Sequence, residues 1–113
     1  MPATVNLHSK FRRRLKRLRR KYPAVTQEVN KLVTELENDQ RPGVKLSGFG
    51  FDVYKVCLPN PSARRGKSGG FRVVYYAQFA DLVHLVTIYA KSEESDVSVH
   101  AVQGVLAEIE AID

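Results

Sequence analysis

The sequence contains one cysteine, Cys57, and three histidines that are scattered along the chain. A lone cysteine cannot form an internal disulfide, which agrees with a reducing compartment. One Cys and dispersed His also supply no zinc-type ligand set, so we expect neither a metal nor a cofactor. The apolar run Leu82–Ala90 is interrupted by His84 and is too short to span a bilayer. No apolar stretch follows the N-terminal charges, so we expect no secretory signal and predict a cytoplasmic protein.

The length and composition indicate a folded globular chain. A length of 113 residues fits one domain, which we place at 1–113. Hydrophobic residues make up 43% and charged residues 27%, which is too apolar for disorder.

The N-terminal segment Lys10–Lys21 lacks acidic residues, and the segment after Lys91 lacks lysine and arginine. Nine of the 18 Lys and Arg residues lie between Lys10 and Lys21, with no acid among them. Past Lys91 there is no Lys or Arg, whereas six of the 12 acids lie there. A solvated helix face is one explanation of the basic run. Because so many like charges repel one another, an anionic partner is the better one, and we expect nucleic acid, RNA before DNA.

The hydrophobic period predicts helices at both ends of the chain. Leu7–Tyr22 and Val25–Leu36 carry apolar residues at steps of three and four, with Pro23 between them. Val97–Ile109 returns to this spacing, with Ser92 or Ser95 as the expected N-cap. A short strand over Ala3–Leu7 precedes the first helix.

Between Gly43 and Lys91 the period changes to two. We predict strands over Val44–Leu46, Phe51–Leu58, Phe71–Ala77 and Leu82–Ala90, joined as an antiparallel meander. The expected fold is α+β: a twisted antiparallel sheet of three to five strands against an N-terminal helical hairpin, with a C-terminal helix.

The loop Asn60–Gly70 contains a Gly-Lys-Ser sequence that resembles a phosphate-binding P-loop. That motif requires Gly five positions before Gly66, where this chain has Pro61, and a helix where Phe71 begins a strand. We therefore reject a nucleoside triphosphate site. The loop's cations suit a phosphodiester backbone instead; they are Arg64, Arg65 and Lys67.

Cations also lie on or next to the predicted strands. Lys55, Arg72 and Lys91 belong to neighbouring strands of one meander, so they can converge on one face and neutralise a phosphate without metal. A nucleophilic Cys57 with His84 or His100 as base has no supporting sequence context, and burial is the usual state of a lone Cys. Tyrosines on strands more often belong to the core than stack on nucleobases, so base stacking is the less favoured interpretation for them. The tyrosines concerned are Tyr75, Tyr76 and Tyr89.

Two ordered segments, Gly66–Tyr76 and Ile88–Ser92, together with the helical hairpin, closely resemble the RelE/ParE superfamily of bacterial toxins, especially its RelE and HigB branches. The resemblance implies the toxin of a type II toxin–antitoxin pair. Such toxins cut messenger RNA in the ribosomal A site without metal, by attack of the RNA 2′-hydroxyl on the adjacent phosphate. The implied partners are a cognate antitoxin, which would also supply DNA binding, and ribosomal RNA.

The resemblance also implies roles for individual residues. Arg72 matches the arginine that supports the phosphate, Lys55 the first of two strand lysines, and Lys91 a basic residue after the last strand. The usual acid/base set is incomplete in this chain, and Tyr89 or His100 is the candidate substitute for its missing members. The loop cations and the basic helix would bind RNA, the helix through Arg13, Arg17 and Arg20.

Three positions depart from the RelE pattern. Cys57 stands at the second strand lysine, Ser92 at an arginine and Ser98 at the tyrosine of the C-terminal helix. Two alternatives therefore stay open: a ParE-like inhibitor of DNA gyrase, and a toxin homologue that binds RNA but has lost catalysis.

Overall fold

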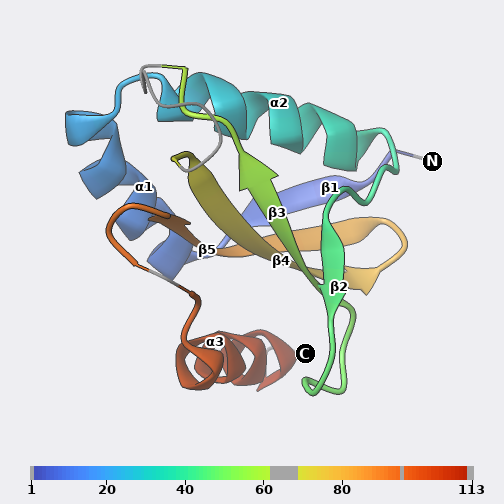
Figure 1. Ribbon diagram of the computed structural model, residues 1–113. Helices are drawn as coiled ribbons and strands as arrows, with labels where there is room; N and C mark the ends of the chain where they lie inside the picture. Colours follow the sequence, from blue (N-terminus) through green and yellow to red (C-terminus); the bar gives the residue numbers. More distant parts are fainter. Residues whose placement is uncertain (1, 62–68, 95, 112–113) are drawn as a thin grey trace.

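The computed structural model describes residues 2–61, 69–94 and 96–111. Three helices and five strands follow one another in these residues (Figure 1): β1 Thr4–Leu7, α1 Ser9–Lys21, α2 Val25–Glu37, β2 Val44–Leu46, β3 Val53–Leu58, β4 Phe71–Phe79, β5 Leu82–Ala90 and α3 Val99–Ala111.

The helical hairpin forms where the sequence predicts it. In α1 the apolar side chains Phe11 and Leu18 are buried, while most of the arginines are exposed. The helix ends at Lys21 because Pro23 cannot continue the hydrogen-bond ladder, and the Tyr22 N–H bonds to the Leu18 carbonyl at 2.7 Å. α1 therefore contributes to the core along one face and carries positive charge on the others.

The sheet has the strand order β1-β5-β4-β3-β2. The strands β2, β3, β4 and β5 form the expected antiparallel meander. β1 differs, because it pairs with β5 in parallel and makes the sheet mixed. α1 and α2 separate β1 from the meander in sequence, and a helical crossover of this kind permits a parallel pair.

The two faces of the sheet are covered unequally. α1 and α2 lie on one side and α3 lies on the other (Figure 1). The larger core joins the hairpin to the sheet through side chains such as Phe11, Leu32 and Leu85, which are fully buried. A smaller core joins α3 to Val53, Val74, Tyr76 and Val86.

The start of β3 and the N-cap of α3 differ from the predicted ones. β3 begins at Val53 instead of Phe51, because the turn that precedes it includes Gly50 at a φ of +74°. α3 begins at Val99, and its N-cap is Ser98, whose hydroxyl accepts a hydrogen bond from the Ala101 N–H at 3.2 Å. Ser92 is therefore not the cap, and Ser95 lies outside the described residues. No helix within the described ranges is long and apolar enough to cross a membrane.

Candidate functional site

Three chemically useful side chains lie in one row across the α3 side of the sheet. In the register of the strands, Cys57 of β3 is opposite Arg72 of β4, and Arg72 is opposite Tyr89 of β5. Directly opposed residues of antiparallel strands share a face, so the three side chains are neighbours. α3 packs further along the sheet, against Val53 and Tyr76, and leaves this row uncovered by its core contacts.

Lys55 belongs to the next row of the same face and lies two residues from Cys57. Its ammonium is 3.3 Å from a carboxylate oxygen of Asp96, in the segment between β5 and α3. The Asp96 pKa is lowered first by the Val97 N–H and then by Lys55, with a smaller contribution from Lys91. Lys55, Lys91 and Asp96 therefore lie close enough to interact, which places both lysines near the row.

The backbone before Arg72 is shaped by Gly70, which has a φ of +93°. A Cβ at this position would lie 2.5 Å from the Leu58 carbonyl oxygen, so any larger residue would disturb the pairing of β3 with β4. The same Cβ would lie 3.7 Å from a terminal nitrogen of Arg72. Arg72 is half-buried and donates one bond, of 3.3 Å, to the Phe71 carbonyl. Gly70 is therefore required by its φ and by the close approach of the Leu58 carbonyl, whereas the contact with Arg72 would be an ordinary one.

Tyr89 is 3% exposed and its environment favours the protonated phenol. Burial raises the Tyr89 pKa, and Asp96 raises it further, whereas Arg72 acts in the opposite direction. Tyr89 therefore keeps its proton at neutral pH beside a guanidinium. The Tyr89 phenol can donate its proton to an oxygen of a phosphate that Arg72 binds.

Some cations of the basic helix α1 form ion pairs with described carboxylates, and others do not. Arg14 and Lys21 face the segment after β5 and pair with Glu94 and Glu93. Arg13, Arg17 and Arg20 are exposed and none of them has an ion pair with a described residue, although Arg17 lines the same hollow as Arg14, Glu93 and Glu94. Arg12, Lys16 and Arg19 are likewise exposed and have no ion pair with a described residue, so the choice of Arg13, Arg17 and Arg20 as RNA contacts stays a prediction. Arg64, Arg65 and Lys67 lie outside the described residues.

The histidines do not approach Cys57. His84 is opposite Tyr76, four residues along β4 from Arg72, and bonds to Asn6 at 3.1 Å and to Gln78 at 2.8 Å. His100 lines a hollow between α1 and α3 instead. The dismissal of a Cys–His dyad agrees with this placement. The expectation that Cys57 is buried was wrong: it is exposed, because α3 packs further along this face of the sheet.

All three tyrosines considered for base stacking are buried, and Tyr89 is only 3% exposed. Tyr75 is fully buried on the side of α1 and α2, stacks on Tyr54 at a centroid distance of 5.1 Å, and bonds to the Pro42 carbonyl. Tyr76 is buried under α3 and donates to Glu110 at 3.1 Å. Neither ring is available to a nucleobase.

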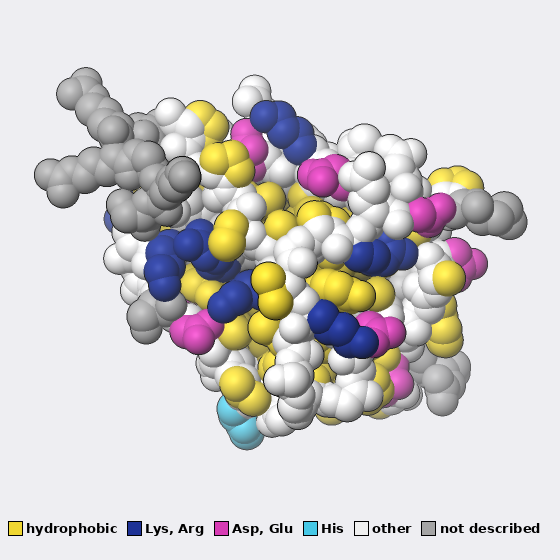
Figure 2. Space-filling model, turned by 45° about the vertical axis from the view of Figure 1, so that its right-hand side comes forward, with side chains coloured by type: hydrophobic (Ala, Val, Ile, Leu, Met, Phe, Trp, Pro, Cys, Tyr) yellow, Lys and Arg dark blue, Asp and Glu magenta, His cyan; other side chains and the backbone are white. Residues whose placement is uncertain are grey.

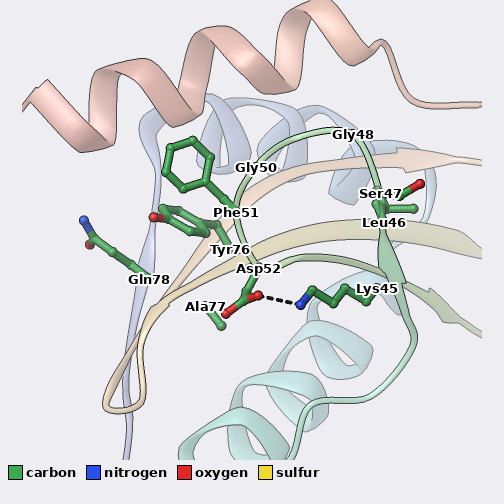
Figure 3. A pocket seen from close by; sticks show the side chains of 10 residues that line it. All are labelled: Lys45, Leu46, Ser47, Gly48, Gly50, Phe51, Asp52, Tyr76, Ala77 and Gln78. Atoms are coloured by element: carbon green, nitrogen blue, oxygen red, sulfur yellow. Dashed lines mark ion pairs between the residues drawn. The ribbon is translucent and has the colours of Figure 1, made fainter.

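A hollow of about 460 Å³ lies at the other end of β4, between that strand and the loop after β2 (Figure 3). Its cation, Lys45, is 2.7 Å from Asp52, and this carboxylate raises the Lys45 pKa. Phe51 packs edge-on against Tyr76 at 5.3 Å. Because its positive charge is already balanced, this hollow is a poorer phosphate site than the Arg72 row.

Sequence reasoning missed the acidic residues of the site. Glu93, Glu94 and Asp96 were assigned to a separate acidic end of the chain, whereas each pairs with a cation far away in sequence. Figure 2 shows the same mixing on one face of the molecule, where several Lys and Arg side chains have Asp or Glu beside them. No group of His, Cys, Asp and Glu suited to a metal occurs within the described residues.

The comparisons with known proteins identify the fold. No protein-family model and no curated protein matches the sequence. Among solved structures, the chain is similar to the E. coli toxin RelE in the free state, in a variant with two arginines replaced by alanine. The alignment covers 100% of both chains, with a TM-score of 0.54 and 19% sequence identity. The chain therefore has the RelE-like α+β fold that the sequence resemblance predicted.

Proposed function

We propose that this protein is the toxin of a type II toxin–antitoxin system and acts as a metal-independent, ribosome-dependent mRNA endonuclease. One observation carries the proposal: the strands bring Arg72 and Tyr89 into one row, with Lys55 in the next row of the same face. A cationic group, a protonated phenol and a second cation beside an open end of a sheet fit a phosphodiester in the act of cleavage.

The chemistry follows from these groups. The 2′-hydroxyl of one nucleotide attacks the adjacent phosphorus, and the bond from phosphorus to the 5′-oxygen of the next nucleotide breaks. Arg72 and Lys55 stabilise the negative charge that develops on the phosphorane. The 2′-hydroxyl loses its proton to water as it attacks, Tyr89 gives its proton to the departing 5′-oxygen, and a proton from water restores the phenol. The products are a 2′,3′-cyclic phosphate and a 5′-hydroxyl, with no water or metal consumed.

The remaining cations support substrate binding in this proposal. Arg13, Arg17 and Arg20 form an exposed basic line on α1 that suits the phosphates of ribosomal RNA. The loop residues Arg64, Arg65 and Lys67 would grip the mRNA on either side of the cut. The ribosome and a cognate antitoxin are the partners, and both place the protein in the cytoplasm.

A second candidate is a toxin homologue that binds RNA without cutting it. It is favoured by Ser98, which caps α3 at the position where the resemblance expects a tyrosine. Cys57, next to Arg72, likewise stands where a second strand lysine is expected. This candidate keeps the binding surface and removes part of the acid/base set.

Primer extension on a defined mRNA in a translation reaction, with and without ribosomes, tests the proposal. Wild type should give cuts that require ribosomes, and Arg72→Ala should give none. Lys45→Ala, which removes a cation from an exposed ion pair at the other end of the sheet, is the control and should cut like wild type. Intact mRNA with bound RNA would support the homologue without catalysis. Intact mRNA with inhibited DNA supercoiling would support the gyrase inhibitor.

A further inference from the structure

Three carboxylates that follow β5 pair with cations on two other elements. Glu94 accepts two bonds from Arg14 of α1, at 2.8 and 3.4 Å. Glu93 lies 3.4 Å from the ammonium of Lys21, also on α1. Asp96 lies 3.3 Å from the ammonium of Lys55 on β3. We call Glu93, Glu94 and Asp96 the acidic residues of the β5–α3 connection.

Further hydrogen bonds hold these ion pairs in place. Arg14 is partly buried and also donates to the Ile88 carbonyl of β5 at 3.2 Å, which fixes its guanidinium toward the connection. The Tyr22 hydroxyl donates to the same Glu93 carboxylate at 3.4 Å. Asp96 accepts the Val97 N–H at 2.7 Å in addition to Lys55. Each carboxylate thus has a defined place beside its cation.

The paired cations lie next to the surfaces that an RNA would occupy. Lys55 shares a sheet face with Arg72, and Arg14 and Lys21 are on the same helix as Arg13, Arg17 and Arg20, which have no ion pair with a described residue. A phosphate that approaches Lys55 meets the ionised carboxylate of Asp96, which lies 3.3 Å from the ammonium. Two anions cannot both contact one ammonium closely without repulsion.

We propose that Glu93, Glu94 and Asp96 are internal anions that compete with RNA phosphates for Arg14, Lys21 and Lys55, so that RNA binding displaces the β5–α3 connection. The inference rests on the proposed function, because it takes RNA as the polyanion. All three carboxylates are substantially exposed, so their ion pairs are weak enough for a polyanion to replace them. The connection therefore sets the affinity of the free protein for RNA below the value that its net charge would give.

The test compares two variants of the whole chain that change the net charge equally. The first is Glu93→Gln/Glu94→Gln/Asp96→Asn. The control is Glu37→Gln/Asp39→Asn/Asp81→Asn, which removes three exposed acids at the other end of β5. Fluorescence anisotropy measures the binding of a labelled single-stranded RNA with 2′-O-methyl groups, which cannot be cut, over a series of salt concentrations.

Each exposed ion pair corresponds to a factor of roughly two to three in an equilibrium constant. The first variant should therefore bind about tenfold more tightly than wild type at low salt. It should also show a salt dependence that is steeper by roughly 0.7 per newly contacted phosphate. The control should bind at most about twofold more tightly, since long-range attraction is screened over about 10 Å at 0.1 M salt.

Equal gains in the two triple variants would overturn the inference, because general charge and not competition would then control binding. Equal affinity of wild type and the first variant would overturn it as well. Absence of RNA binding in every protein would overturn both the inference and the proposed function. Glu94→Gln alone, which leaves the turn at Asp96 intact, should give part of the gain and guards against misfolding of the triple variant.

Discussion

The two faces of the sheet use the same strands for different purposes. On the side of α1 and α2, alternate residues of β4 and β5 such as Val73, Tyr75 and Leu85 are fully buried in one apolar core. On the other side α3 covers only part of the strands, and the remaining end carries the exposed Cys57, the half-buried Arg72 and the buried Tyr89. The strands' two-residue period separates these roles, because successive side chains point to opposite faces.

This difference teaches that stability and chemistry can be changed independently. A substitution on the covered face alters packing, and one at the open end alters charge and proton transfer. The predictions below test this separation, from the largest expected effect to the smallest.

Leu85→Ala removes a fully buried side chain from the covered face. It should lower the free energy of unfolding by about 2–5 kcal/mol, because the lost contacts leave a cavity that the core fills only partly. Chemical denaturation measures this. Cleavage per folded molecule should remain close to wild type. A stable variant, or a folded but inactive one, would contradict the separation of the two faces.

Arg72→Ala should have the opposite profile. Single-turnover cleavage on ribosomes should slow by about 10²–10³-fold, since a charge-stabilising donor is lost. The free energy of unfolding should change by less than about 1 kcal/mol, because Arg72 is half-buried and bonds only to the adjacent Phe71 carbonyl among the described residues. Arg72→Lys should recover part of the rate. Undiminished cleavage by Arg72→Ala would remove this residue from the site.

Tyr89→Phe should slow cleavage by about 10²-fold, because it removes the proton donor and keeps the buried ring. The thermal unfolding midpoint should hardly change. The Tyr89 pKa is raised above its ordinary value by burial and by Asp96, so the phenol stays protonated at the neutral pH of the assay. A rate equal to wild type would show that another group protonates the leaving oxygen.

His84 should make stability depend on pH. Burial lowers the His84 pKa from 6.5, so below pH 6.5 the unfolded chain binds a proton that the folded chain resists. The stabilisation is present in full above pH 6.5 and is lost as the pH falls through the lower, folded value. The unfolding midpoint should therefore decrease between pH 7.5 and pH 5. His84→Gln should show a smaller decrease over this range, and an identical pH profile would contradict the assignment.

Cys57→Ala should have the smallest effect. Cys57 is exposed, so the free energy of unfolding should change by less than about 0.5 kcal/mol. Cleavage should stay within about twofold of wild type, as a thiol has no assigned step. Loss of activity in this variant would give the thiol a role in the site.

The hydrophobic periods predicted much of this fold. The 3.6-residue period of α1 and α2 and the two-residue period of the meander are local signals, and Pro23 and Gly43 mark where they end. The parallel pairing of β1 with β5 is not a local signal, because it depends on how two helices carry the chain across the sheet. The Ser98 cap was missed since Ser92, Ser95 and Ser98 are equally plausible caps in sequence.

The candidate site was only partly predictable. Lys55 and Arg72 stood out as cations within strands, and the strand register places them near each other. The partners Asp96, Glu93 and Glu94 could not be found from the sequence. Their contacts span 41, 72 and 80 residues, and they depend on the path of the chain after β5. The exposure of Cys57 depends on where α3 stops covering the sheet, which is also a tertiary property.

The most direct test of the account is the chemistry of the cut ends. Messenger RNA cut by wild type in a translation reaction is treated with or without a 5′-kinase and then ligated to an adapter. Attack by the 2′-hydroxyl, with Arg72 and Lys55 on the phosphate, predicts fragments that begin with a 5′-hydroxyl and ligate only after the kinase step. It also predicts that Arg72→Ala yields no such fragments. Fragments with a 5′-phosphate, or equal cutting by Arg72→Ala, would contradict the account.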